Sequence, residues 1–284
     1  MSKSLIINSQ NYVAGSGNKY QYNFPTEMSF KSGDKIGLSQ ISIYNSSFNI
    51  TSALQNNTYS IVWNANTQST FNITIPNSYM SVSDLNYYIQ SQCIANNLYV
   101  TSNNGSDYVY FVEVVVNAPL YAAQINCYPL PTSAQATTLG YSMPSNATWS
   151  YPTTATCPQF VISSGLGTLL GFTNQTVFPP NNTFSSAQQY LSNTSPIVSP
   201  VNSYILTCNL LNSKYAIPNN VFYSVSLGNA VFGAQIILTN SNIIYNDISP
   251  QKYNSIIITI LDQNFNSAVL NDYEVVIVLS ILEA

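Results

Sequence analysis

The sequence predicts an all-β protein, an antiparallel β-sandwich with an inserted, mostly-β domain that contains one short helix. The first observation is that β-branched and aromatic runs, separated by Gly-, Pro- and Asn-rich turns, recur at both ends of the 284-residue chain. The second is that the middle differs, with one helical pattern and long polar stretches. We therefore expect residues 1–52 and 196–284 to form one domain and residues 53–195 to form a second domain inserted into it.

The N-terminal third contains five expected strands. The first lies within residues 4–13, and the second alternates cleanly over 20–24. A longer strand spans 35–50, and short strands follow at 59–63 and 70–75. Turn residues separate them, and the first two strands could pair or run in series.

The strand over 35–50 changes phase. Ile36 and Leu38 share one parity, whereas Ile41 and Ile43 take the other. Because successive side chains of a strand point to opposite faces, a β-bulge near residues 39–40 is needed to bring all four to one face.

A single helix is expected after Pro76. Ser81 and Asp84 fit a capping box, with Ser81 as the N-cap and Asp84 at the third helical position. The apolar positions that follow recur every three or four residues: Val82, Leu85, Ile89 and Cys93. We expect an amphipathic helix that ends near residues 96–97.

The remaining chain returns to strands after a polar excursion. Residues 129–158 carry much Pro, Ser, Thr and Ala with little periodicity, which indicates loops. Strands are expected on both sides of this excursion, at 108–116, 120–128, 159–162, 204–210, 221–227 and 233–239.

The last stretch predicts a terminal β-hairpin, with strands over 255–261 and 273–282 and a polar turn over 262–271. Both strands are apolar on successive residues, so neither face suits water. One face should lie on a second sheet, and the other on the inserted segment or a neighbouring subunit. The sandwich is therefore expected to complete its burial by association.

Charge is scarce, because only 6% of residues are charged and the chain has no His and no Arg. Ser-His-Asp and Cys-His pairs, histidine metal sites and arginine phosphate clamps are excluded, so we predict no enzyme, no cofactor and no metal. The net charge of −4 argues against specific nucleic-acid binding. Lys3, Lys19, Lys31 and Lys35 make the N-terminus the most basic part, and a solvated arm is favoured there over a contact with packaged genome.

The cysteines, Cys93, Cys127, Cys157 and Cys208, are widely spaced and form no CxxC. Buried free thiols are favoured over a zinc site built from four distant strands. The N-terminus lacks a signal-peptide apolar region, and no apolar run reaches the roughly 20 residues of a membrane span. We expect no transmembrane segment and a reducing compartment.

The glycines Gly165, Gly167 and Gly171 approximate a nucleotide-binding loop. The third glycine comes one position too late for GxGxxG, and no lysine follows as in a P-loop. A tight turn into a buried Leu169–Leu170 pair is favoured.

Two further groups of residues have functional interpretations. Asp262, Asp272 and Glu274 cluster in the terminal turn and could form a glycosidase pair, but carboxylates beside a turn are usually solvated. Trp63 and Trp149, with the 22 tyrosines, could form a sugar-stacking platform. We favour aromatics that fill sheet faces and subunit interfaces.

Six motifs follow one another in an order typical of one family. They are KIGLSQISIYNSSFNIT (35–51), FNITIPNSYMSVSDLNYYIQ (71–90), YPLPTS (128–133), GTLLGFTNQTVFPP (167–180), SYILTCNLLNSKYAIPNNVFYSV (203–225) and YNSIIITILDQNFN (253–266). The chain resembles the penton, or minor capsid, proteins of virophages and of the related Polinton-type viruses. The Asn- and Ile-rich composition suits an AT-rich genome such as a marine virophage carries.

The resemblance implies a single jelly-roll capsid protein without catalytic residues. It implies a homopentamer at each fivefold vertex of the virion, surrounded by trimers of a double jelly-roll major capsid protein, assembled in the host cytoplasm. The inserted domain would project outward. A second hypothesis makes that domain a module that binds a host receptor or glycan.

Overall fold

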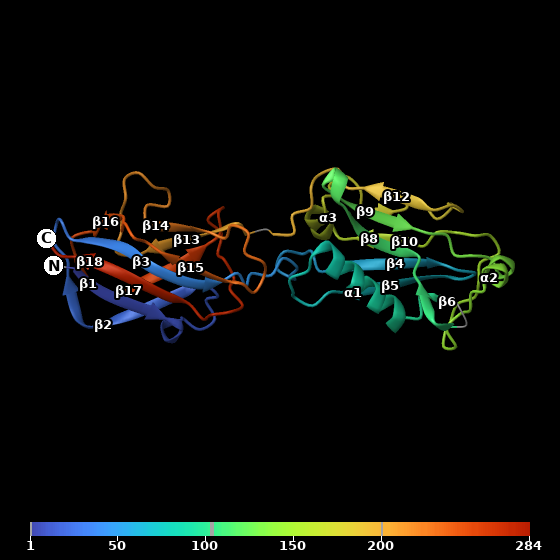
Figure 1. Cartoon of the computed structure of the whole chain (residues 1–284), viewed down its shortest axis with the longest axis horizontal. Coiled ribbons are helices and arrows are strands. Elements are labelled where there is room, and N and C mark those ends of the chain that lie inside the picture. Colours follow the sequence, from blue (N-terminus) through green and yellow to red (C-terminus); the bar gives the residue numbers. More distant parts are fainter. Residues whose placement is uncertain (1, 103–104, 200) are drawn as a thin grey trace. The chain divides into compact units, whose positions relative to one another are not determined.

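The computed structural model describes residues 2–102, 105–199 and 201–284, and it divides the chain into two compact units. We call Met1–Phe48 with Ser199–Ala284 the split unit, and Asn49–Val198 the inserted unit. Both are mostly β, with several antiparallel sheets (Figure 1). Each unit has its own cluster of buried apolar side chains.

The split unit consists of two sheets. One has the strand order β1–β18–β3–β15, with β16 also paired to β3, and the other has the order β14–β13–β17–β2. The bounds are β1 Ser2–Asn8, β2 Lys19–Ser29, β3 Lys35–Tyr44, β13 Ser203–Cys208, β14 Val221–Ser226, β15 Gln235–Thr239, β16 Tyr245–Asp247, β17 Lys252–Leu261 and β18 Val276–Leu282. Strands from opposite ends of the chain are neighbours, since β1 pairs with β18 and β2 with β17. The two termini accordingly lie at the same end of this unit (Figure 1).

The core of the split unit lies between its two sheets. In β17, Ile256, Ile258 and Ile260 are fully buried, and their neighbours along the strand are only partly buried. In β18, Ile277 and Leu279 are fully buried. Because one cluster holds residues from both strands, which belong to different sheets, the sheets pack face to face.

The predicted β-bulge in β3 is confirmed. Val278 of β18 is opposite Gln40, and the next residue, Leu279, is opposite Leu38, so Ser39 is the extra residue. The bulge restores a common inward face, and the four predicted positions are buried: Ile36, Leu38, Ile41 and Ile43.

The predicted terminal hairpin is wrong. In the part of the chain that the structure describes, β17 pairs with β13 and β2, whereas β18 pairs with β1 and β3 in the other sheet. Leu270 and Val275, in the connecting segment, are buried, and the backbone N–H of Leu270 donates to the Gly17 carbonyl. The connection therefore crosses the end of the core between the sheets, because its apolar residues are buried there.

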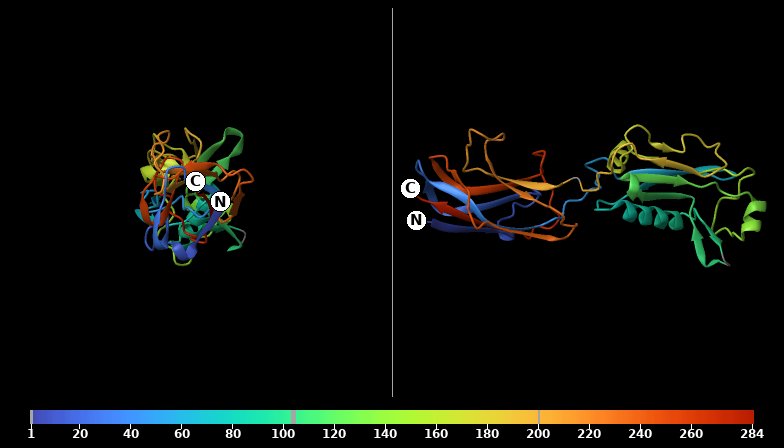
Figure 2. Two further views of the ribbon diagram at one scale, coloured as in Figure 1. Left: turned by 90° about the vertical axis from the view of Figure 1, so that its left-hand side faces the viewer. Right: turned by 45° about the horizontal axis from the view of Figure 1, so that its top comes forward.

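The inserted unit contains a four-stranded sheet, β11–β10–β4–β5, a three-stranded sheet, β12–β9–β8, and the pair β6–β7. Its strand bounds are β4 Thr58–Asn64, β5 Gln68–Thr74, β6 Val100–Ser102, β7 Asp107–Val109, β8 Val112–Asn117, β9 Ala122–Cys127, β10 Gln159–Ile162, β11 Val177–Phe178 and β12 Gln188–Leu191. Helix α1 runs along one side of these strands (Figure 2). The Asn86 side chain of α1 accepts a hydrogen bond from Val114 N of β8, so the helix covers a sheet edge.

The predicted helix is confirmed as α1, Val82–Ala95, with the Ser81–Asp84 capping box and the expected buried stripe. The prediction of a single helix is wrong. The described residues also form α2, Ser133–Leu139, and α3, Ser164–Leu170. Both have seven residues, too few for a readable helical period, and α2 lies in the stretch expected to be loops.

A buried asparagine ties together the two ends of the inserted unit. The Asn49 amide nitrogen donates to the Met80 carbonyl at 2.8 Å and to the Val198 carbonyl at 2.9 Å. Its oxygen accepts from Met80 N at 2.9 Å. The segments that enter the unit at Asn49 and leave it at Val198 are therefore held side by side.

Candidate functional surfaces

The three glycines of the nucleotide-like pattern serve backbone packing. A Cβ at Gly165, Gly167 or Gly171 would lie 2.6, 2.6 or 2.1 Å from a backbone oxygen. Gly171 also ends α3 in the left-handed conformation, at φ +86°. The predicted burial of Leu169 and Leu170 is confirmed, and helix α3 takes the place of the expected tight turn.

The carboxylates of the terminal turn are engaged locally. The Asp262 carboxylate accepts from the backbone N–H groups of Asn264 and Asn266, at 2.8 and 2.9 Å. The Asp272 carboxylate accepts from the Glu274 N–H at 2.9 Å. These are turn-closing contacts, the usual use of Asp in a loop.

The four cysteines are buried, as predicted, and unpaired. Burial raises the pKa of Cys93 and of Cys208 to about 12 and that of Cys157 to about 11, and it raises the pKa of Cys127 as well. The thiols are therefore protonated at neutral pH and unreactive in the folded chain. Across residues 2–102, 105–199 and 201–284, no cluster of ligating side chains suits a metal ion.

None of the helices described above is both long and apolar enough to cross a bilayer.

The tryptophans lie in the core of the inserted unit. Trp63 and Trp149 have ring centroids 5.1 Å apart, and both are buried. The Trp149 indole N–H donates to the Asn97 carbonyl at 2.6 Å. Because both tryptophans are buried, a sugar-stacking platform would have to consist of tyrosines at the surface.

The cations of the chain are confined to one unit. The inserted unit has no Lys, Arg or His and carries three carboxylates, those of Asp84, Asp107 and Glu113. All six lysines belong to the split unit, and three of them form ion pairs: Lys3 with Glu283, Lys35 with Asp247 and Lys252 with Glu27.

The outer face of the β1–β18–β3–β15 sheet carries exposed apolar side chains. We call Ile6, Ile237, Val276 and Val278 the outer patch. The first three are 57%, 61% and 39% exposed. Ile6 is paired with Val278 across β1 and β18, while Val276 and Ile237 both pair with Ser42 of β3. Sheet alternation places all four on the face opposite the core, as their buried neighbour Ile277 shows. This sheet face is therefore a candidate interaction surface.

A groove lined by tyrosines lies in the inserted unit. We call it the tyrosine groove. Its cavity measures about 430 Å³, and it is lined by Tyr108, Val109, Tyr110, Phe111, Glu113, Tyr128, Pro129, Pro131, Leu139 and Tyr141. Tyr108 lies on β7, Glu113 on β8, and Tyr128 directly after β9, while α2 supplies Leu139. Two sheets and a helix therefore hold its walls.

The groove combines flat aromatic faces with one carboxylate. Tyr108 is 51% exposed, and its ring lies 6.4 Å from that of Tyr110 at an interplanar angle of 12°. Tyr99 packs edge-on against Tyr108 at 5.0 Å and supports it from outside the groove. The Tyr128 hydroxyl donates to Glu113 Oε2 at 3.1 Å. Burial and the Glu113 charge raise the pKa of Tyr128, so this phenol remains a donor.

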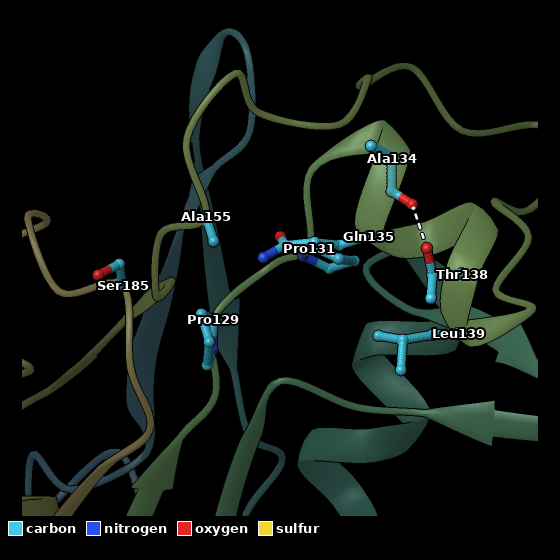
Figure 3. Close-up of a pocket in the computed structure, with 8 residues that line it drawn as sticks. All are labelled: Pro129, Pro131, Ala134, Gln135, Thr138, Leu139, Ala155 and Ser185. Atoms are coloured by element: carbon cyan, nitrogen blue, oxygen red, sulfur yellow. Dashed lines mark hydrogen bonds between the residues drawn. The ribbon is translucent and has the colours of Figure 1, made fainter.

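A second cavity of about 480 Å³ adjoins the tyrosine groove, and Pro129, Pro131 and Leu139 line both. Figure 3 shows helix α2, which carries Gln135, on one side of it, and Ala155 and Ser185 on the other side. The Thr138 hydroxyl is engaged within the helix, where it donates to the Ala134 carbonyl (Figure 3).

Comparison with known proteins gives matches among solved structures alone, since no family model and no curated protein matches the chain. The crystal structure of the mavirus penton protein is 10% identical, with 99% of this chain and 97% of that chain covered, at a TM-score of 0.43. The structure of the Sputnik virophage is also 10% identical, with 100% and 97% covered, at a TM-score of 0.39.

Proposed function

We propose that the chain is a structural capsid protein, a penton protein of the virophage type, and not an enzyme. The observation that supports this most directly is the strand order of the split unit, β1–β18–β3–β15 facing β14–β13–β17–β2. Two facing antiparallel sheets whose strand orders interleave the two ends of a chain are the pattern of a single jelly roll, a fold common in viral capsids. The ordered sequence motifs support the same assignment.

The proposed assembly is a homopentamer at the fivefold vertex of an icosahedral virion. A closed fivefold ring needs two different patches on each subunit, because its interfaces are heterologous. The outer patch supplies an apolar surface for one of them, and the 6% charged composition leaves little repulsion between copies. A stable contact of this kind buries more than about 1,200 Å².

The test of this assembly is the mass of the purified chain by light scattering and native mass spectrometry. We expect pentamers for the wild type and monomers for the double variant Ile6→Asp with Ile237→Asp, because two buried charges would be left unpaired in the interface. Val231→Asp, at a 73% exposed loop position, is the control and should remain pentameric. A wild-type chain that stays monomeric at high concentration would refute the proposal.

The proposed partners and location follow from the same assignment. The pentamer would fill the vertex between trimers of a double jelly-roll major capsid protein, in virions assembled in the host cytoplasm. The jelly roll would be the split unit, and the inserted unit would project outward. Labelling of intact virions with an antibody against the inserted unit tests the orientation, and labelling restricted to vertices is the expected result.

A second role is favoured by the tyrosine groove, which suits recognition of a host receptor or glycan. Replacing Asn49–Val198 with a short linker should leave pentamers intact and abolish attachment to host cells. Attachment that survives this deletion would exclude the second role.

A further inference from the structure

We propose that the tyrosine groove is a binding site for a neutral oligosaccharide. The inference rests on the second role above, attachment through the inserted unit, and it specifies the residues and the class of ligand. It does not depend on pentamer formation.

The first argument is the shape of the aromatic wall. The rings of Tyr108 and Tyr110 are nearly parallel, at 12°, and the segment that carries them presents both to the same cavity. A flat, half-exposed phenol ring offers an apolar face of the kind that packs against the C–H face of a pyranose. An aromatic cage for a quaternary ammonium ion would instead need rings that surround one point.

The second argument is the supply of hydrogen bonds. Glu113 receives a bond from Tyr128 on Oε2, and no donor among the described residues reaches Oε1. The hydroxyls of Tyr108, Tyr110 and Tyr141 make no hydrogen bond to any residue that the structure describes. The groove therefore presents one charged acceptor and several phenol groups that can both donate and accept, which matches adjacent hydroxyls on a sugar ring.

The third argument is charge, and it selects among sugars. The inserted unit has no Lys, Arg or His, so it has no cationic side chain to pair with a carboxylate, sulfate or phosphate. With Glu113 in the groove, an anionic ligand would also meet a like charge. Sialylated and sulfated glycans are therefore disfavoured, and neutral hexoses and N-acetylhexosamines are favoured.

The fourth argument is the combined length of the groove and the adjoining cavity. The groove and the adjoining cavity share Pro129, Pro131 and Leu139, so a chain of sugars can continue from one to the other. The second cavity offers the Gln135 amide nitrogen and the Ser185 hydroxyl as polar groups, while the Gln135 amide oxygen accepts from Thr132 N at 2.9 Å in the cap of α2. Both volumes, about 430 and 480 Å³, lie within the roughly 300–1,000 Å³ of small-molecule sites.

The experiment uses the full chain and ligand-observed NMR. The probes are neutral trisaccharides of glucose, galactose, mannose and N-acetylglucosamine, each at up to about 10 mM, in the weak range of affinities. Sialylated and sulfated counterparts and tetramethylammonium are the competing probes. We expect at least one neutral trisaccharide to bind, and its charged counterpart to bind more weakly.

Variants then locate the site. Tyr108→Ala and Tyr110→Ala should each weaken binding about tenfold, as loss of a stacked aromatic does. Glu113→Gln should weaken it by a smaller factor, because the side chain keeps its shape and loses the charged acceptor. Tyr87→Ala, at a 69% exposed tyrosine of α1 outside the groove, is the matched control and should bind as the wild type does.

Several outcomes would overturn the inference: no binding of any neutral probe, unchanged binding in Tyr108→Ala, or preferred binding of a charged glycan or of tetramethylammonium. The titration is repeated on the monomeric Ile6→Asp, Ile237→Asp variant. The variant should bind the trisaccharide as a monomer. For the wild-type chain, pentamers without sugar binding would refute this inference alone, and sugar binding without pentamers would refute the assembly proposal alone.

Discussion

The split unit and the inserted unit differ in the electrostatic interactions open to them. The split unit has six lysines and seven carboxylates, whereas the inserted unit has three carboxylates and no cation. Favourable contacts with an anionic partner through side-chain charge are thus restricted to the split unit. One chain can therefore concentrate its charged side chains, 13 of 16, in one of two β-rich units and leave the other without a cation.

The units also differ in the sequence distance of their strand pairs. In the split unit, β1 pairs with β18, and the hydroxyls of Ser2 and Ser280 form a hydrogen bond across 278 residues. In the inserted unit, β4 pairs with β5 and β8 with β9, each its neighbour along the chain. Local pairings form sooner than distant ones. The inserted unit can therefore fold before the C-terminal strands complete the split unit.

Removing one buried side chain from each core tests whether the two units are stable independently of each other. Phe160, in the inserted unit, and Ile258, in the split unit, are both fully buried. Phe160→Ala should lower the free energy of unfolding of its unit by about 3–5 kcal/mol, and Ile258→Ala by about 2–5 kcal/mol, through lost burial and cavity formation. Thiol labelling followed by mass spectrometry measures the two units separately.

The thiols make this assignment because they are buried and protonated in the folded state. Cys93, Cys127 and Cys157 report on the inserted unit and Cys208 on the split unit. Phe160→Ala should expose the first three and leave Cys208 protected, and Ile258→Ala should do the reverse. Equal labelling of all four in both variants would mean that the chain unfolds as one cooperative body.

A smaller effect is expected at the junction that holds the ends of the inserted unit. Asn49→Ala leaves the carbonyls of Met80 and Val198 and the N–H of Met80 without their partner. The free energy of unfolding of the inserted unit should fall by about 2–4 kcal/mol, as expected for several buried groups left unsatisfied. Urea titration followed by tryptophan fluorescence measures this unit, since both tryptophans lie in it.

The control for Asn49 is Asn57→Ala. Asn57 makes one side-chain hydrogen bond, to the Ile75 carbonyl at 3.2 Å, so its loss should cost less than about 1 kcal/mol. If the two alanine variants lose equal stability, the Asn49 contacts do not anchor the unit.

The sequence predicted those features that depend on neighbouring residues. The bulge at Ser39 followed from a parity change between Leu38 and Ile41, and helix α1 followed from its capping box and apolar stripe. Helices α2 and α3 were missed because seven residues show no period, although a capping signal was present: Thr132 and Gln135 form the same box that predicted α1.

Pairing between distant segments was the part that local patterns could not decide. An apolar strand, a polar stretch and a second apolar strand fit a hairpin and a crossover between sheets equally well. The structure shows the crossover, since β17 and β18 pair in different sheets and Leu270 of the connection is buried. The tyrosine groove could not be predicted for the same reason. Tyr108 of β7, Glu113 of β8 and Tyr141, which follows α2, line one cavity only because these elements pack together. Composition gave the abundance of tyrosine but not its location.

The smallest expected effects concern one carboxylate in each unit. The backbone N–H groups of Lys31 and Ala284 donate to Asp34 at 2.7 and 2.9 Å and lower its pKa. The Ser81 hydroxyl and N–H donate to Asp84 at 2.6 and 3.0 Å and lower its pKa. A carboxyl group whose pKa is lower in the folded state stabilises the folded state at pH values above its unfolded-state pKa of about 4. This contribution to stability is lost as the pH falls through the folded-state pKa.

Asp34→Asn and Asp84→Asn should therefore each reduce stability at pH 7 by about 1 kcal/mol, the loss of charge-assisted hydrogen bonds at a turn and a helix cap. As the pH is lowered from 7 towards 2 and the wild-type carboxylates become protonated, the difference from wild type should narrow. Asp84→Asn should lower the midpoint of the unfolding transition that tryptophan fluorescence follows, because both tryptophans lie in the inserted unit. Asp34→Asn should instead lower the midpoint of a transition that circular dichroism detects and tryptophan fluorescence does not. A deficit that is the same at both pH values would show that the carboxylate charge contributes nothing to either contact, and that shape alone holds the turn and the cap.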